Sequence, residues 1–173
     1  VLHLIDQRKL PEEYTIYRCS EYRDVEFAIR DMVVRGAPAI GATAAYGVYL
    51  AALEFVEQPK ETFLSKLTEA SHFIEKARPT AVNLSWAIRR MLNVVEENRE
   101  LSPEEIASHL EEEAGRILAE DIETNKRMAS HGNELVPDEA TILTHCNTGA
   151  LATAGWGTAL GVVREAYASG KSI

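Results

Sequence analysis

The chain has 173 residues, of which 46% are apolar and 26% charged, and its formal net charge is −9. This composition is typical of an ordinary globular protein with enough apolar residues to form a core. An acidic surface repels phosphate backbones and anionic lipids, so we expect neither a nucleic acid nor a membrane as partner. A small phosphorylated molecule is still compatible with this charge, because a few local donors suffice to bind it.

The two cysteines, Cys19 and Cys146, are too few to form a disulfide framework. Because the chain also shows no secretory leader, its free cysteines predict a cytoplasmic location. The five histidines are scattered, and none pairs with another His or Cys at a ligand spacing. We therefore expect no metal site.

The N-terminal part is predicted to form a hairpin followed by helices. Two β-type runs, at residues 1–5 and 14–19, predict a small antiparallel hairpin. Helically spaced apolar residues then predict a helix over residues 22–34. The uncharged residues 36–53 approach the length of a membrane span. Since this segment contains glycines, polar residues and Pro38, we interpret it as a helix buried in a globular core, with Pro38 in its first turn.

Three further helices are expected. One covers residues 60–76, and the next starts at Thr80 or Asn83. The third has a strong start signal, because Ser102 can cap it, a proline follows and a glutamate stands three residues after the cap. We expect this long connecting helix to cover about residues 102–131, with Gly132 placed to end it.

The pattern changes after residue 137. A β-type run at residues 140–146 stops at a glycine-containing turn, which leads into a helix ending near Gly170. Strand, turn and helix are the first parts of a βαβ unit, although no second strand is present to pair with the first. We therefore predict an α/β chain. Its mainly helical N-terminal domain with a small β-hairpin would cover residues 1–131, and residues 132–173 would begin a truncated Rossmann-like domain.

Two arginines precede predicted helix starts. Arg35 stands before Gly36 and Ala37, and Arg78 stands before a proline and a threonine. Exposed N–H groups at a helix start favour an anion, and a guanidinium can pair with two phosphate oxygens. The alternative is that both arginines are solvated and that the neighbouring residues only end and start helices.

Cys146 closes the predicted strand at residues 140–146. In open α/β sheets, ligands bind beyond the carboxyl ends of the strands, where a thiol can carry a proton or act as a nucleophile. Adjacent strand residues face opposite sides, so we do not expect His145 and Cys146 to meet the same ligand. The alternative is a buried structural cysteine.

Four stretches resemble a known family in the same order. They are LIDQ with LP at residues 4–11, MVVRGAPAIG at 32–41, RPTAVNL at 78–84 and ILTHCNTGALAT at 142–153. Together they span most of the chain and resemble the methylthioribose-1-phosphate isomerases of methionine salvage. The wider family includes ribose-1,5-bisphosphate isomerases and the regulatory subunits of a translation-factor exchange complex. We keep both as alternative functions, the second being a non-catalytic sugar-phosphate-binding subunit.

The resemblance implies a homodimeric aldose–ketose isomerase that needs no metal or nucleotide cofactor. Its substrate would be 5-methylthioribose 1-phosphate and its product 5-methylthioribulose 1-phosphate. Arg35, Gly36, Ala37 and Arg78 would contact the phosphate and the sugar, and Cys146 would be the catalytic thiol. The family's catalytic aspartate has no match here, so we expect residues 1–173 alone to be inactive unless a second chain supplies the C-terminal half.

Overall fold

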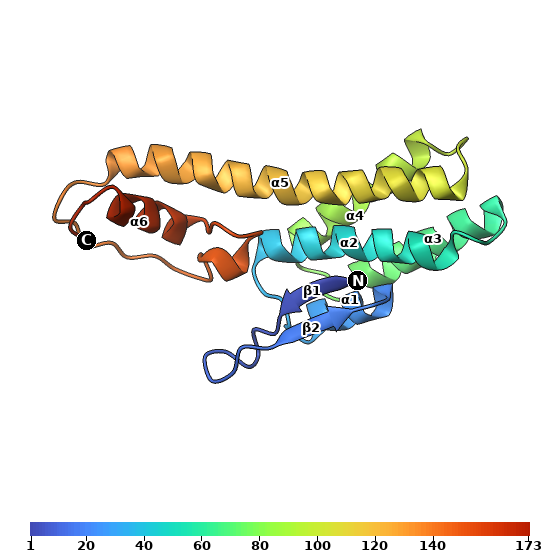
Figure 1. Ribbon diagram of the computed structural model, residues 1–173, viewed down its shortest axis with the longest axis horizontal. Coiled ribbons are helices and arrows are strands. Elements are labelled where there is room, and N and C mark those ends of the chain that lie inside the picture. Colours follow the sequence, from blue (N-terminus) through green and yellow to red (C-terminus); the bar gives the residue numbers. More distant parts are fainter.

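The computed structural model describes residues 1–173 and is mainly helical (Figure 1). In chain order its elements are β1 (Leu2–Ile5), β2 (Ile16–Cys19), α1 (Tyr22–Arg30), α2 (Ala37–Phe55), α3 (Lys60–Glu75), α4 (Val82–Glu97), α5 (Pro103–Leu135), the short 3-10 helix η1 (Ala150–Ala152) and α6 (Ala159–Ala168). Figure 1 shows α5 running along most of the molecule, with α2 beside it and the C-terminal segment beside the C-terminal end of α5.

Helix α2 is the centre of the core. It contacts α1, α3, α4 and α5, and its residues Ala44, Ala45 and Ala51 have no exposed surface. Small side chains let these four helices approach α2 closely. Pro38 lies in the first turn of α2, and no helix combines the length and apolar character needed to span a bilayer. The prediction of a buried core helix is therefore confirmed.

The expected hairpin is also confirmed. Strands β1 and β2 pair in antiparallel register, with Leu2 opposite Cys19 and Ile5 opposite Ile16. Just after β1, the buried carboxylate of Asp6 accepts hydrogen bonds from Arg8 Nε at 2.8 Å and Arg8 Nη2 at 2.7 Å. The hydrogen bonds from Arg8 hold the pKa of the Asp6 carboxyl below its ordinary value. A buried charge is stable here because it is fully paired.

Helix α1 is shorter than its apolar spacing predicts. It ends at Arg30 instead of continuing to residue 34, because the backbone at Met32 is left-handed, with φ of 60°. Val33 and Val34 are nevertheless buried. Their apolar character reflects burial in a turn and not the continuation of the helix.

Helix α5 begins as predicted and ends later. The Ser102 hydroxyl accepts from Glu105 N at 3.3 Å, and the Glu105 carboxylate accepts from Ser102 N at 2.9 Å, which forms a complete capping box. Gly132 does not end the helix, which continues to Leu135. A β-carbon built on Gly132 would lie 2.6 Å from a methyl of Val162 in α6. The glycine therefore permits α6 to pack closely against α5. Our expectation that Gly132 ends the helix is wrong, and its small size serves this packing instead.

The predicted strand at residues 140–146 is not formed. Leu143 in this segment is 96% exposed, and the segment's only backbone hydrogen bond runs from Ala140 N to Ser172 O, at 3.0 Å. A strand needs a hydrogen-bonded neighbour, and the only other strands belong to the distant hairpin. The following helix does form, as α6. The observed class is thus a helical chain with a two-stranded antiparallel sheet, without a parallel unit.

The contact between α5 and α6 yields a stability prediction. Gly132→Ala adds helix propensity, but its new methyl overlaps Val162, so we expect a net loss of about 1–2 kcal/mol in the free energy of unfolding. Gly115→Ala on the same helix meets no atom within 4 Å and should stabilise the protein by about 0.5–1 kcal/mol. Urea unfolding of both variants tests this, and an equal gain in both would contradict the packing argument.

Candidate functional site

The start of α2 forms one side of the site. Gly36 is its N-cap residue, with a left-handed φ of 97°, and no side chain caps the first turn. The first N–H groups of the helix are therefore left without a side-chain acceptor. Arg35 and Ala37, on either side of Gly36, are exposed. Free N–H groups, the positive end of the helix dipole and an adjacent guanidinium together suit an anion.

Gly36 also brings two predicted segments together. A β-carbon built on it would lie 2.3 Å from Ala152 Cα and 2.4 Å from Ala152 O. The backbone of η1 therefore lies directly against the N-cap of α2, and Figure 1 shows η1 beside this end of the helix. Only glycine satisfies both the positive φ and this contact. The arginine motif at residues 35–38 thus meets the segment that follows Cys146.

The second arginine motif meets the same end of α2. A β-carbon on Gly41 would lie 3.1 Å from Asn83 O, so the first turn of α4 packs beside the first turns of α2. Helix α4 begins after Ala81, which lacks a capping side chain, and neither Thr80 nor Asn83 is the cap that we expected. Arg78 lies half-buried in the turn before this helix. Two helix starts without side-chain caps, each following an arginine, therefore adjoin.

Cys146 lies on an exposed loop and not at the end of a strand. Its backbone is left-handed, with φ of 70°, a conformation that costs a non-glycine residue about 1–2 kcal/mol and is often found at functional sites. His145 is exposed as well, so the strand-based expectation that the two side chains face opposite sides does not apply. Cys146 is not the buried structural cysteine of the alternative reading.

Cys19 fits that structural role instead. It is fully buried at the end of β2. Burial, with a smaller contribution from Asp24, raises the pKa of the Cys19 thiol to about 12. The two thiols therefore differ sharply in accessibility.

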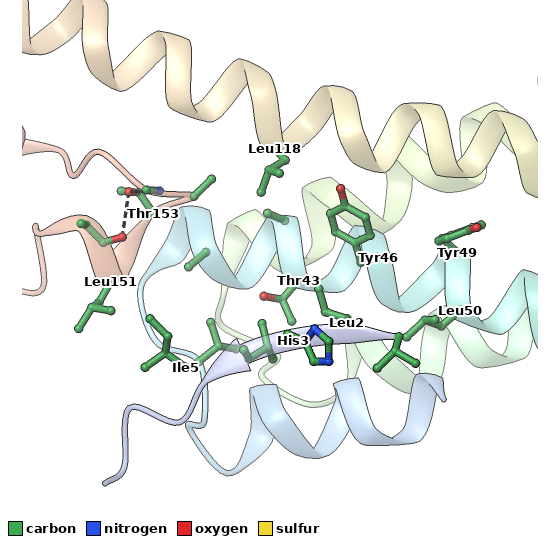
Figure 2. Close-up of a pocket in the computed structure, with 18 of the residues that line it drawn as sticks. Leu2, His3, Ile5, Thr43, Tyr46, Tyr49, Leu50, Leu118, Leu151 and Thr153 are labelled. Atoms are coloured by element: carbon green, nitrogen blue, oxygen red, sulfur yellow. Dashed lines mark hydrogen bonds between the residues drawn. The ribbon is translucent and has the colours of Figure 1, made fainter. Parts of the chain in front are cut away.

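A large cavity lies beside α2 and η1. A groove of about 770 Å³ opens between β1, α2, α5 and residues 150–155, and 15 of its 20 lining residues are apolar (Figure 2). Its polar groups come from His3, Thr43, Tyr46, Tyr49 and Glu111, among others. Sequence reasoning did not identify this groove, although the two tyrosines interrupt the apolar stretch of α2. None of the five predicted site residues lines it.

Residues 33–173 match the initiation factor 2 subunit family. The chain belongs to this family. It is 62% identical over 173 residues to a methylthioribose-1-phosphate isomerase of Thermoanaerobacter sp. (strain X514), covering 100% of this chain and 50% of that protein. It is 52% identical to the isomerase of the same name from Caldicellulosiruptor saccharolyticus, covering 99% of this chain and 50% of the relative. The chain thus spans about half the length of the curated relatives it matches.

Two solved structures share this fold. The 5-methylthioribose 1-phosphate isomerase of Pyrococcus horikoshii OT3 superposes with a TM-score of 0.92 at 43% identity, over 98% of this chain and 47% of that one. Subunit delta of the translation initiation factor eIF-2B from A. fulgidus superposes with a TM-score of 0.87, also at 43% identity, over 98% of this chain and 49% of that one. The fold is therefore common to proteins named as an enzyme and as a translation factor.

The difference between the two thiols can be tested directly. At about pH 8 we expect one thiol per native chain to react rapidly with N-ethylmaleimide, because Cys146 is exposed and Cys19 is shielded and protonated. Intact-mass measurement should show one adduct on the native protein and two after unfolding. Cys146→Ser should remove the rapid reaction, and a second rapid adduct on the native protein would disprove the burial of Cys19.

Proposed function

We propose that this chain is the N-terminal part of a methylthioribose-1-phosphate isomerase of methionine salvage. The supporting observation is 62% identity to an isomerase of that name, over all 173 residues. The contacts of Gly36 with Ala152 and of Gly41 with Asn83 add support, because three of the four resembling stretches converge at the start of α2.

The proposed site residues form two groups, one that binds the substrate and one that carries out the hydrogen transfer. Arg35 and Arg78, with the backbone of Gly36 and Ala37, bind the phosphate and the sugar through charge and free N–H groups. A phosphate on C1 locks the sugar in its ring form, so the enzyme must assist ring opening before hydrogen moves from C2 to C1. Cys146 acts as one acid/base in this transfer, and a carboxylate in the C-terminal half acts as the other. No atom is gained or lost overall.

The architecture of the whole protein is part of the proposal. Residues 1–131 form the N-terminal domain, and residues 132–173 begin a Rossmann-like domain whose parallel sheet requires further strands of the same or a second chain. The hydrogen bond between Ala140 N and Ser172 O supports this arrangement, since it joins the expected first strand to the residues where the second would begin. The whole enzyme is a cytoplasmic homodimer that takes a small sugar phosphate and no metal or nucleotide.

One alternative has its own supporting observation. The superposition on the eIF-2B subunit delta of A. fulgidus, at 43% identity, favours a non-catalytic sugar-phosphate-binding subunit as the second candidate. Such a subunit would bind the phosphate at the start of α2 and would have no use for the exposed thiol. Turnover therefore separates the two functions.

Substituting the thiol tests the proposed function. In the full-length protein supplied with 5-methylthioribose 1-phosphate, Cys146→Ser should lower kcat by about a hundredfold or more, because the hydroxyl is a poor acid/base. The matched control Cys19→Ala should keep kcat within about twofold, since Cys19 contacts only the core. Binding without turnover in the unsubstituted protein would favour the regulatory subunit, and turnover of ribose 1,5-bisphosphate alone would favour the other isomerase.

A second variant tests the binding role. Arg35→Lys keeps the charge but loses the planar pair of donors, so we expect KM to rise about tenfold with a smaller change in kcat. Arg99→Lys, on an exposed turn distant in sequence from both arginine motifs, serves as the control for the loss of a guanidinium. An unchanged KM in Arg35→Lys would remove Arg35 from the phosphate site.

A further inference from the structure

Residues 148–158, called the site turn from here on, are held together by their own hydrogen bonds. Thr158 N donates to Thr148 O at 2.9 Å and closes the turn. The hydroxyl of the buried Thr153 donates to Ala150 O at 3.3 Å and accepts from two glycine N–H groups of the turn, at 3.0 and 3.1 Å. Those two N–H groups make no backbone hydrogen bond. One hydroxyl thus satisfies two donors that would otherwise be unpaired.

A carboxylate on α5 anchors the site turn. Asp121 Oδ2 accepts from Ala154 N at 2.7 Å. Its other oxygen accepts from Asn125 Nδ2 at 3.0 Å, and the same amide nitrogen donates to Asp121 O at 2.9 Å. Asn125 is only 3% exposed. Because both carboxylate oxygens are engaged and the orienting amide is buried, Asp121 holds the turn in a single position on α5.

The site turn is also held from two other elements. Gln7, just after β1, donates from its side chain to Leu151 O at 2.8 Å. Gly36 packs against the backbone of Ala152 from the start of α2. The turn is therefore fixed by the hairpin, α2 and α5 together, at the place where the arginine motif begins its helix.

The position of Cys146 depends on the position of the site turn. It stands two residues before the site turn, and its left-handed backbone is one that non-glycine residues adopt only when their surroundings impose it. The hydroxyls of Thr144 and Thr148 bridge the loop across Cys146 at 3.4 Å. A shift of the site turn would therefore move Cys146 relative to the start of α2.

We propose that Asp121 and Thr153 are positioning residues of the candidate site, which hold the site turn against the start of α2 and so place Cys146 for its reaction. Both act through the backbone of the turn and not on the substrate. The proposal rests on the isomerase function proposed above. It adds Asp121 of α5, which lies in none of the four resembling stretches, and it gives Thr153, the last residue of the fourth stretch, a role that the motif did not assign.

The test uses paired variants of the full-length protein. Thr153→Val removes the hydroxyl with little change of shape, and Thr153→Ser retains the hydroxyl. Asp121→Ala removes the anchor of the turn. Ser102→Ala weakens the capping box at the opposite end of α5 and is the control for a general loss of stability. Hydrogen exchange of residues 144–158 is measured together with kcat and KM on 5-methylthioribose 1-phosphate.

We expect Thr153→Val and Asp121→Ala to speed exchange in the site turn and to lower kcat about tenfold, with KM within about twofold. Thr153→Ser and Ser102→Ala should resemble the unsubstituted protein in both measurements. Unchanged exchange, or faster exchange with unchanged kcat, would overturn the positioning role while leaving the isomerase function intact. An unsubstituted protein without turnover would overturn the proposed function and, with it, the positioning role.

Discussion

The burial of most of α2 is the constraint on which the rest of the structure depends. Of its 19 residues 13 are buried, and its one charged residue, Glu54, lies in its last turn, so most of its surface must be covered by other elements. Helices α1, α3, α4 and α5 provide this cover. Two of these helices, α4 and α5, are joined by Arg90 of α4, which forms ion pairs with Glu113 and Glu120 of α5. A helix enclosed in this way offers its polar backbone groups only at its ends, and the arginine motif stands at one of them.

A missing side-chain cap does not by itself mark a binding site. Helices α1 and α5 begin with capping boxes, whereas α2 and α4 have no side-chain cap. Helices α3 and α6 also lack one, and we assign no anion site to them. The starts of α2 and α4 differ from these two because each follows an arginine and because they pack against each other. Position and charge, more than free N–H groups, make this end of the molecule a candidate site.

Features with local causes could be predicted from the sequence, and features that depend on distant partners could not. The capping box of Ser102, the hairpin and the enclosed helix each follow from neighbouring residues or from one stretch of composition. The packing role of Gly132 depends on Val162, which lies 30 positions further along the chain, and a strand at residues 140–146 needs a partner strand. Asp121 was missed as a support of the site because it accepts from a backbone N–H, a contact that leaves no residue pattern. Gln7 belongs to the LIDQ stretch, but the motif did not predict its bond to Leu151 O.

The contact of Gly36 with Ala152 limits how this sequence can vary. A clash between two side chains can be relieved by shrinking the second one, so a harmful change often has a compensating change elsewhere. Here the crowded atoms of Ala152 include its Cα and its carbonyl oxygen, which every amino acid possesses. No replacement at position 152 can make room for a side chain at position 36. A genetic search for second-site suppressors of a Gly36 substitution should therefore find none at residue 152, and the two positions are not expected to co-vary.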